Sequence, residues 1–205
     1  MPNPNLLFVS FPRSGAHLLR GLLEACSNHY METTKMFPDE TTGQCIGLHT
    51  HDLDFTHLAA LQTKSSPYTH LLVVTRDPLD VLHSQCEYYG YNWWSEHWRN
   101  LVERTFVEMR AHQKKYEQAE LPVPKLSLTY DLLVSNPAVA VCSVCAFLGL
   151  AQPSEEQVRA GIAFCTKTNL RVAIKHDAKA ISPETDEYNA SREQFRRRYQ
   201  YLMRG

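Results

Sequence analysis

The sequence VSFPRSGAHLLRGLLE, residues 9–24, joins an apolar run to an amphipathic segment through a short polar turn. The apolar run covers residues 6–11 and ends at Pro12, which is typical of a buried strand. Beyond the turn, leucines recur at helical spacing, so a helix is predicted from about Ala16 to Asn28. Because the first turn of a helix exposes backbone N–H groups, it favours an anion. The stretch therefore predicts a strand, an anion-binding loop and a helix.

The loop carries side chains that suit an anion. Gly15 lets the backbone approach a ligand closely, Arg13 can bind two oxygens at once, and Ser14 adds a hydroxyl. A Walker A motif would end in Gly-Lys-Ser/Thr, whereas Ala16 and His17 follow the glycine here. Hydrolysis of ATP or GTP is therefore disfavoured. A plain strand-turn-helix with a surface arginine is the alternative.

A second strand-loop-helix is predicted at residues 73–85, VVTRDPLDVLHSQ. Arg76 ends the apolar run, and Asp77, followed by proline, can cap the next helix. Ser84 lies eight residues after Arg76, about two turns into that helix. A second anion could bind between Arg76 and Ser84. Alternatively, Arg76 pairs with Asp77 or Asp80.

The remaining sequence continues the alternation of strands and helices. A third strand is predicted at residues 126–130, and one long helix from Trp93 to Glu120. Two further helices begin at Pro137 and after Ser154, which opens a capping-box pattern. This alternation implies an α/β fold with a central parallel sheet flanked by helices. With 205 residues and no repeat or linker, the chain is predicted to form a single domain.

Composition narrows the functional classes. The net charge of −1 argues against general nucleic-acid binding, so an anion site must be a local cluster of basic residues. No apolar run approaches the roughly 18 residues of a transmembrane helix, and we interpret the N-terminus as the start of a strand rather than a secretion signal. The six cysteines show no regular framework, which favours reduced thiols in a cytoplasmic protein.

These motifs resemble those of the sulfotransferase family. Four family motifs occur in the family's order: Pro12-Arg13-Ser14-Gly15 for the P-[KR]-S-G loop, His49-Thr50-His51 for part of a Lys-Thr-His segment, Arg76 and Ser84 for an Arg and a Ser eight apart, and Tyr130-Asp131, Pro137 and Phe147-Leu148-Gly149 for a Tyr-Glu-Asp, Pro and Phe-Leu-Gly series. Each motif is weak alone, but four in order across residues 6–150 are specific.

The resemblance implies a three-layer, P-loop-like fold and transfer of a sulfuryl group from 3′-phosphoadenosine 5′-phosphosulfate (PAPS), without a metal. By analogy, three groups of residues bind the donor: Arg13, Ser14, Gly15, Ala16 and His17 at the 5′-phosphosulfate, Arg76 and Ser84 at the 3′-phosphate, and Tyr130 near the adenine.

The resemblance also implies two catalytic residues. Arg13 would stabilise negative charge on the leaving phosphate oxygen. His51 would accept the proton of the acceptor, since an ordinary imidazole is largely neutral at pH 7. His49 and His17 are the rival bases.

The chain departs from the family pattern at two places. Ala16 and His17 stand where many members have hydroxyl residues, and the C-terminal Arg-Lys-Gly signature at the 3′-phosphate is absent. A basic cluster could replace that signature or form a solvated helix: Arg192, Arg196, Arg197, Arg198 and Arg204.

The acceptor is expected to be a small molecule or carbohydrate-like compound. Aromatic residues follow the Arg76 helix and could stack on a planar or sugar-like acceptor, or instead pack the core or a homodimer contact: Tyr88, Tyr89, Tyr91, Trp93, Trp94 and Trp98. Cys142 and Cys145 are interpreted as core helix residues. The competing functions are a P-loop metabolite kinase and a non-catalytic nucleotide-binding module.

Overall fold

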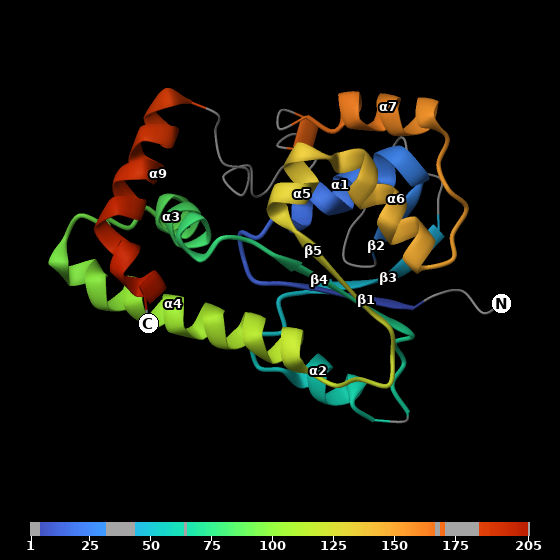
Figure 1. Cartoon of the computed structure of the whole chain (residues 1–205), viewed down its shortest axis with the longest axis horizontal. Coiled ribbons are helices and arrows are strands. Elements are labelled where there is room, and N and C mark those ends of the chain that lie inside the picture. Colours follow the sequence, from blue (N-terminus) through green and yellow to red (C-terminus); the bar gives the residue numbers. More distant parts are fainter. Residues whose placement is uncertain (1–4, 32–43, 64, 167–168, 171–184, 205) are drawn as a thin grey trace.

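The computed structural model of the chain describes residues 5–31, 44–63, 65–166, 169–170 and 185–204 (Figure 1). Its centre is a sheet of five parallel strands in the order β2-β3-β1-β4-β5. The strands are β1 (Leu6–Ser10), β2 (His29–Met31), β3 (Gln44–Thr50), β4 (His70–Thr75) and β5 (Lys125–Thr129). The predicted α/β fold with a central parallel sheet is confirmed.

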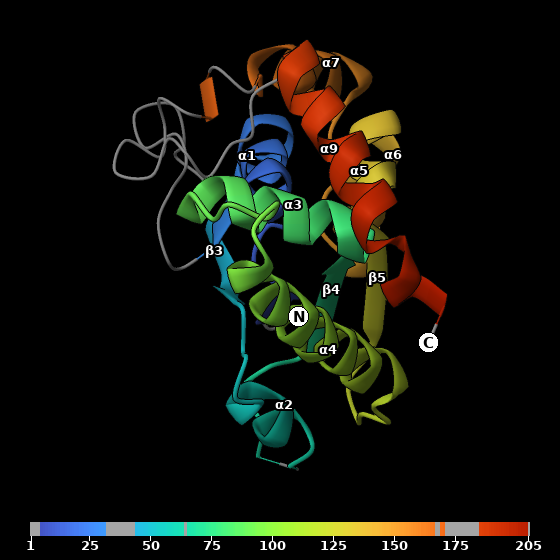
Figure 2. The same ribbon diagram turned by 90° about the vertical axis from the view of Figure 1, so that its left-hand side faces the viewer.

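Helices cover both faces of the sheet, which makes three layers (Figure 1). One face carries α1 (Ala16–Ser27), α5 (Tyr130–Ser135), α6 (Pro137–Phe147) and α7 (Glu155–Phe164). The other face carries α2 (Thr56–Leu61) and α4 (Glu96–Gln118). Figure 2 shows α9 (Asp186–Tyr199) lying across α3 (Pro78–Tyr89), and the short 3-10 helix η2 (Gln200–Arg204) follows α9.

Burial of β1 on both faces fixes this layering. Leu6 and Phe8 pack into the core beneath α1 and α6, while Leu7 and Val9 pack into the core beneath α2 and α4. All four side chains are fully buried. Successive strand residues point to opposite faces, so a continuous apolar strand requires a layer of helices on each side.

The helix boundaries confirm the capping signals in the sequence. Asp77 accepts hydrogen bonds from the backbone N–H groups of Leu79 and Asp80 at the start of α3. Ser154 and Gln157 form the predicted capping box of α7. Each contact satisfies N–H groups that have no partner within their own helix.

Several elements differ from the sequence prediction. The strands β2 and β3 and the helix α2 were not predicted. β2 and α2 are too short to show a periodicity, and β3 lies in a stretch of mixed, largely polar sequence. Tyr130 does not end β5; it is the first residue of α5, whose cap is the hydroxyl of Thr129. The long helix begins at Glu96 rather than near Trp93, since Ser95 caps it.

The six cysteines are all free thiols. Cys145 is buried in α6 and Cys142 is partly buried, in agreement with their interpretation as core helix residues. Burial raises the pKa of Cys26 to about 11, so this thiol is protonated at neutral pH. No described helix combines the length and apolarity needed to cross a membrane.

Gly161 lets α7 pack closely against α1. A Cβ at this position would lie 2.5 Å from the sulfur of Cys26 and 2.8 Å from the backbone carbonyl of Ala25. The second contact is with backbone, which cannot move aside as a side chain can.

We therefore expect Gly161→Ala to lower the free energy of unfolding by about 1–3 kcal/mol, through overpacking. Urea denaturation measures the change. Helix propensity alone predicts the opposite sign, because alanine is the better helix former. A variant as stable as the wild type or more stable would contradict the close packing of α1 and α7.

Candidate functional site

The loop between β1 and α1 forms a tight turn at the carboxyl end of the central strand. The N–H of Ser14 donates to the carbonyl of Phe11 over 3.1 Å. Arg13 has a φ of 73° and Gly15 a φ of 97°, both in the left-handed region. A non-glycine residue with positive φ is uncommon, and such strain often marks a functional loop.

The first turn of α1 has no side-chain acceptor for its backbone N–H groups among the described residues. Each of the other α-helices bounded above has one: Asp52 and Asp54 for α2, Asp77 for α3, Ser95 for α4, Thr129 for α5, Asn136 for α6, Ser154 for α7 and Thr185 for α9. The N-cap of α1 is Gly15, which has no side chain to act as an acceptor, and the N–H groups and dipole at this helix N-terminus favour an anion.

Ser14 adds a second unsatisfied donor at this point. Its side chain is fully buried, and its Oγ has no hydrogen-bond partner in the described part of the chain. A buried hydroxyl without a partner costs free energy unless a ligand or water completes it.

The two predicted anion sites are joined by direct contacts. Arg13 Nε donates to Ser84 Oγ over 3.1 Å, and Arg76 Nη1 donates to the carbonyl of Arg13 over 3.0 Å. The Arg76 guanidinium lies 4.0 Å from the ring centre of Tyr130. The structure thus brings together residues that the sequence placed in three separate motifs.

The ring of Tyr130 leaves no room for a side chain at position 15. A Cβ on Gly15 would lie 2.5 Å from Cδ2 of that ring. The Tyr130 ring therefore fills the space beside the glycine, and the same ring contacts the Arg76 guanidinium.

His51 lies just beyond the end of β3 and has a defined tautomer. Its Nδ1–H donates to the carbonyl of Ser10 over 2.7 Å, which leaves Nε2 as the proton-accepting nitrogen. Burial lowers the pKa of His51 and the hydrogen bond to Ser10 opposes this shift, so the ring is neutral at pH 7. This is the state that a general base needs.

The rival histidines differ from His51 in their surroundings. His49 shares a hydrogen bond of 3.1 Å with Ser10 Oγ, and burial, His51, Arg20 and His17 lower the pKa of His49 to about 2. A ring with so low a pKa is a weak proton acceptor. His17 is half-buried at the second position of α1, close enough to influence His49.

Helix α4 holds the ends of β3 and β4 through a buried polar stripe. His112 Nε2–H donates to the carbonyl of His51 over 2.8 Å, and Gln113 Nε2 donates to the carbonyl of Arg76 over 3.2 Å. Tyr116 donates its hydroxyl to the buried carboxylate of Asp52. These residues were not predicted from the sequence, although polar residues at helical spacing within an apolar stripe were a usable signal.

Two arginines of the basic C-terminal cluster, Arg196 and Arg198, form ion pairs, so the cluster is not simply a solvated helix. Arg196 Nη1 lies 2.7 Å from an oxygen of Asp77 and 2.8 Å from one of Asp80. Arg198 pairs with Glu96 over 2.8 Å. The acids of α3 therefore pair with Arg196, and the alternative in which they pair with Arg76 is wrong.

The aromatic residues after α3 divide between core and surface. Trp93 is buried, whereas Tyr89 and Trp94 are 55% and 52% exposed. Tyr88 lies under Arg13, with the guanidinium carbon 4.9 Å from the ring centre. Tyr91 stacks on Trp98 with ring centres 4.5 Å apart. The set thus contributes both to packing and to the surface beside the loop.

No group of three or more His, Cys, Asp and Glu side chains within the described ranges is arranged to hold a metal ion. The groups that converge on the loop are cationic side chains, hydroxyls and helix N–H groups.

The sequence model of the sulfotransferase domain matches residues 3–202. The chain belongs to the sulfotransferase family. No curated protein sequence matches this sulfotransferase.

Solved structures share the fold of this sulfotransferase at low sequence identity. Mouse sulfotransferase SULT7A1 complexed with PAP aligns with a TM-score of 0.59 and 12% identity, over 100% of this chain and 85% of that one. The sulfotransferase from Alicyclobacillus acidocaldarius aligns at 0.52 and 13%, over 92% and 100% of the two chains. The sulfotransferase domain from the curacin biosynthetic pathway aligns at 0.52 and 12%, over 96% and 98%.

We expect Gly15→Ala in this sulfotransferase to weaken anion binding at the loop at least tenfold, because the new methyl group displaces Tyr130 from Arg76. Isothermal titration calorimetry measures the affinity. Gly90→Ala is the matched control, since Gly90 also has a positive φ of 71° but has nothing within 4 Å of the added Cβ. Equal affinities for the two variants would contradict the role of Gly15.

Proposed function

We propose that this sulfotransferase transfers a sulfuryl group from PAPS to a hydroxyl or amine of a small-molecule or carbohydrate-like acceptor, within one domain spanning residues 1–205. Family membership supports sulfuryl transfer. The observation that carries the choice of donor is the position of the α1 N-terminus, where the N-cap residue Gly15 provides no side-chain cap and Arg13, Arg76 and Ser84 converge through direct contacts. PAPS carries an anionic group at each end of a nucleoside, which two adjoining anion sites suit.

The chemistry of the loop fits such a donor. Ser14 Oγ and Arg76 Nε are buried and lack hydrogen-bond partners within the described residues, so each can still bind an oxygen. Arginine forks and helix N–H groups are the usual protein ligands of phosphate. The loop also lacks the Lys-Ser/Thr ending of a Walker A motif, which weighs against the metabolite kinase.

In this proposal the basic residues have distinct roles. The residues of the loop, Arg13 to His17, bind the 5′-phosphosulfate, and Arg13 compensates negative charge there. Arg76 and Ser84 bind the 3′-phosphate, and Tyr130 lies near the adenine. When bound, the donor supplies the activated sulfuryl group. As in phosphoryl transfer, catalysis then depends on positioning and charge stabilisation more than on covalent chemistry.

His51 is the proposed general base. Its Nε2 accepts the proton of the acceptor hydroxyl or amine, because Nδ1–H is held by the carbonyl of Ser10. His112 fixes the backbone of the same residue through the His51 carbonyl. Together these contacts hold the ring in one tautomer and one position, as acid–base catalysis requires.

The acceptor is proposed to bind beside Tyr88. This ring lies against the Arg13 guanidinium, and the exposed ring of Tyr89 follows it with ring centres 4.8 Å apart. An aromatic surface next to the transfer site suits a planar or sugar-like acceptor.

The donor is tested by calorimetry with adenosine 3′,5′-bisphosphate and with ATP, both without magnesium. We expect the bisphosphate to bind at least tenfold more tightly than ATP, because two separate anion sites match its two ends. Tighter binding of ATP would overturn the proposed donor. Transfer of radiolabelled sulfate from PAPS to a panel of acceptors then distinguishes an enzyme from a non-catalytic binding module.

We expect His51→Ala to lower turnover by about 10²-fold or more, the usual contribution of a general base, with bisphosphate affinity unchanged. Sulfate transfer and calorimetry measure the two quantities. His70→Ala is the matched control, since His70 begins β4 at the opposite edge of the sheet and should keep wild-type turnover. Full activity in His51→Ala would remove this residue from the mechanism.

A further inference from the structure

Two carboxylates border the proposed 3′-phosphate site. Asp77 follows Arg76 directly in the chain, and Asp80 lies one turn before Ser84 on α3. Because residues three and four apart share one helix face, Asp77, Asp80 and Ser84 lie on the same side of α3. A phosphate bound by Arg76 and Ser84 would therefore approach two negative charges.

Such an arrangement opposes anion binding in two ways. Uncompensated carboxylates repel a phosphate, and they compete with it for the nearest guanidinium. The nearest guanidinium in sequence is that of Arg76, which the sequence alone could pair with either acid.

The structure resolves this conflict with an arginine from the C-terminal helix. One nitrogen, Nη1 of Arg196, binds Asp77 at 2.7 Å and Asp80 at 2.8 Å. Arg76 instead directs its Nη1 to the carbonyl of Arg13 and its planar face to Tyr130. The arginine that the phosphate needs is thereby kept out of an internal ion pair.

We propose that Arg196 is a positioning residue for the donor site, which neutralises Asp77 and Asp80 and so reserves Arg76 for the 3′-phosphate. This inference rests on the proposed function. It gives the C-terminal basic helix an indirect role: Arg196 acts through the acids of α3 and does not touch the donor.

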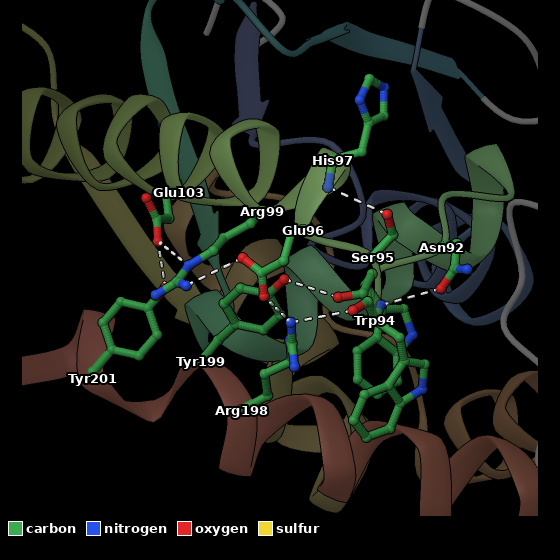
Figure 3. Close-up of polar contacts among 11 residues, drawn as sticks. Asn92, Trp94, Ser95, Glu96, His97, Arg99, Glu103, Arg198, Tyr199 and Tyr201 are labelled. Atoms are coloured by element: carbon green, nitrogen blue, oxygen red, sulfur yellow. Dashed lines mark hydrogen bonds and ion pairs between the residues drawn. The ribbon is translucent and has the colours of Figure 1, made fainter.

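A purely structural role for Arg196 is the competing explanation, in which it only fastens α9 to α3. Other contacts already fasten the C-terminal end of α9 (Figure 3). Arg198 binds Glu96 and the carbonyl of Trp94, and Tyr199 donates to the carbonyl of Trp93. Helix α9 should therefore remain docked when Arg196 is replaced.

Contacts of other α9 side chains with α3 and α4 also indicate that α9 stays docked without Arg196. Phe195 and Tyr199 are buried in the core shared by α3, α4 and α9. Ser191 bonds the buried ring of His83 on α3 over 3.0 Å.

The test compares variants by calorimetric titration with adenosine 3′,5′-bisphosphate. Arg196→Gln removes the positive charge, and we expect its affinity to fall about tenfold at low ionic strength, since the acids are partly exposed and partly screened. Arg197→Gln is the matched control. Arg197 is exposed and makes no ion pair within the described part of the chain, so the same change of charge should leave the affinity unchanged.

A rescue variant separates the electrostatic role from a structural one. Replacing Asp80 as well, in the double variant Arg196→Gln/Asp80→Asn, should restore most of the lost affinity, because one repelling charge is gone. The affinity gap between wild type and Arg196→Gln should also narrow as salt is raised, because salt screens partly exposed charges. Loss of a merely structural contact would show neither rescue nor this salt dependence.

The outcomes are distinguishable from those that test the donor. Failure of the wild-type protein to bind the bisphosphate overturns the proposed function, and the role of Arg196 with it. Wild-type affinity in Arg196→Gln overturns only the role of Arg196. Weakened binding without rescue by Asp80→Asn overturns the electrostatic role.

Discussion

The two-sided parallel pairing of β1 is the constraint on which the rest of the structure depends. β1 pairs with β3 on one side and β4 on the other, so the carboxyl ends of all three strands meet at one edge of the sheet. That edge collects Arg13, His51 and Arg76, which lie on different segments of the chain. Open α/β sheets bind ligands where the strand order changes direction, and β1 lies at that point here.

Helix α4 fixes the positions of the segments that follow β3 and β4. Strand pairing alone brings the loops together but does not set the direction of the side chains that follow each strand. His112 and Gln113 bind the carbonyls of His51 and Arg76, and Tyr116 binds Asp52 at the turn after β3. A single helix thus fixes the segment after β3 and the segment after β4 relative to each other, as precise positioning in catalysis requires.

The sequence predicted the central features because they depend on local rules. Continuous apolar runs gave β1 and β4, and Asp77 and Ser154 gave the starts of α3 and α7. Family resemblance, together with the spacing of Arg76 and Ser84, predicted residues that the structure brings into contact.

What the sequence could not predict depends on tertiary contact. The partner of Asp77 and Asp80 is 116 or more residues away, so no local pattern could favour Arg196 over the adjacent Arg76. Which aromatic residues between Tyr88 and Trp98 are buried also depends on tertiary contact. Trp93, for example, is buried because it packs against Phe195 of α9.

The left-handed backbone of Arg13 has a consequence for the stability of variants at this position. A side chain held at a φ of 73° strains the native state by roughly 1 kcal/mol or more, and glycine would relieve that strain. Glycine would also add conformational entropy to the unfolded chain and would remove the guanidinium that contacts both Ser84 and Tyr88. Relief of backbone strain and loss of side-chain contacts therefore oppose each other at this residue, so the stability of a glycine variant would measure which of the two is larger.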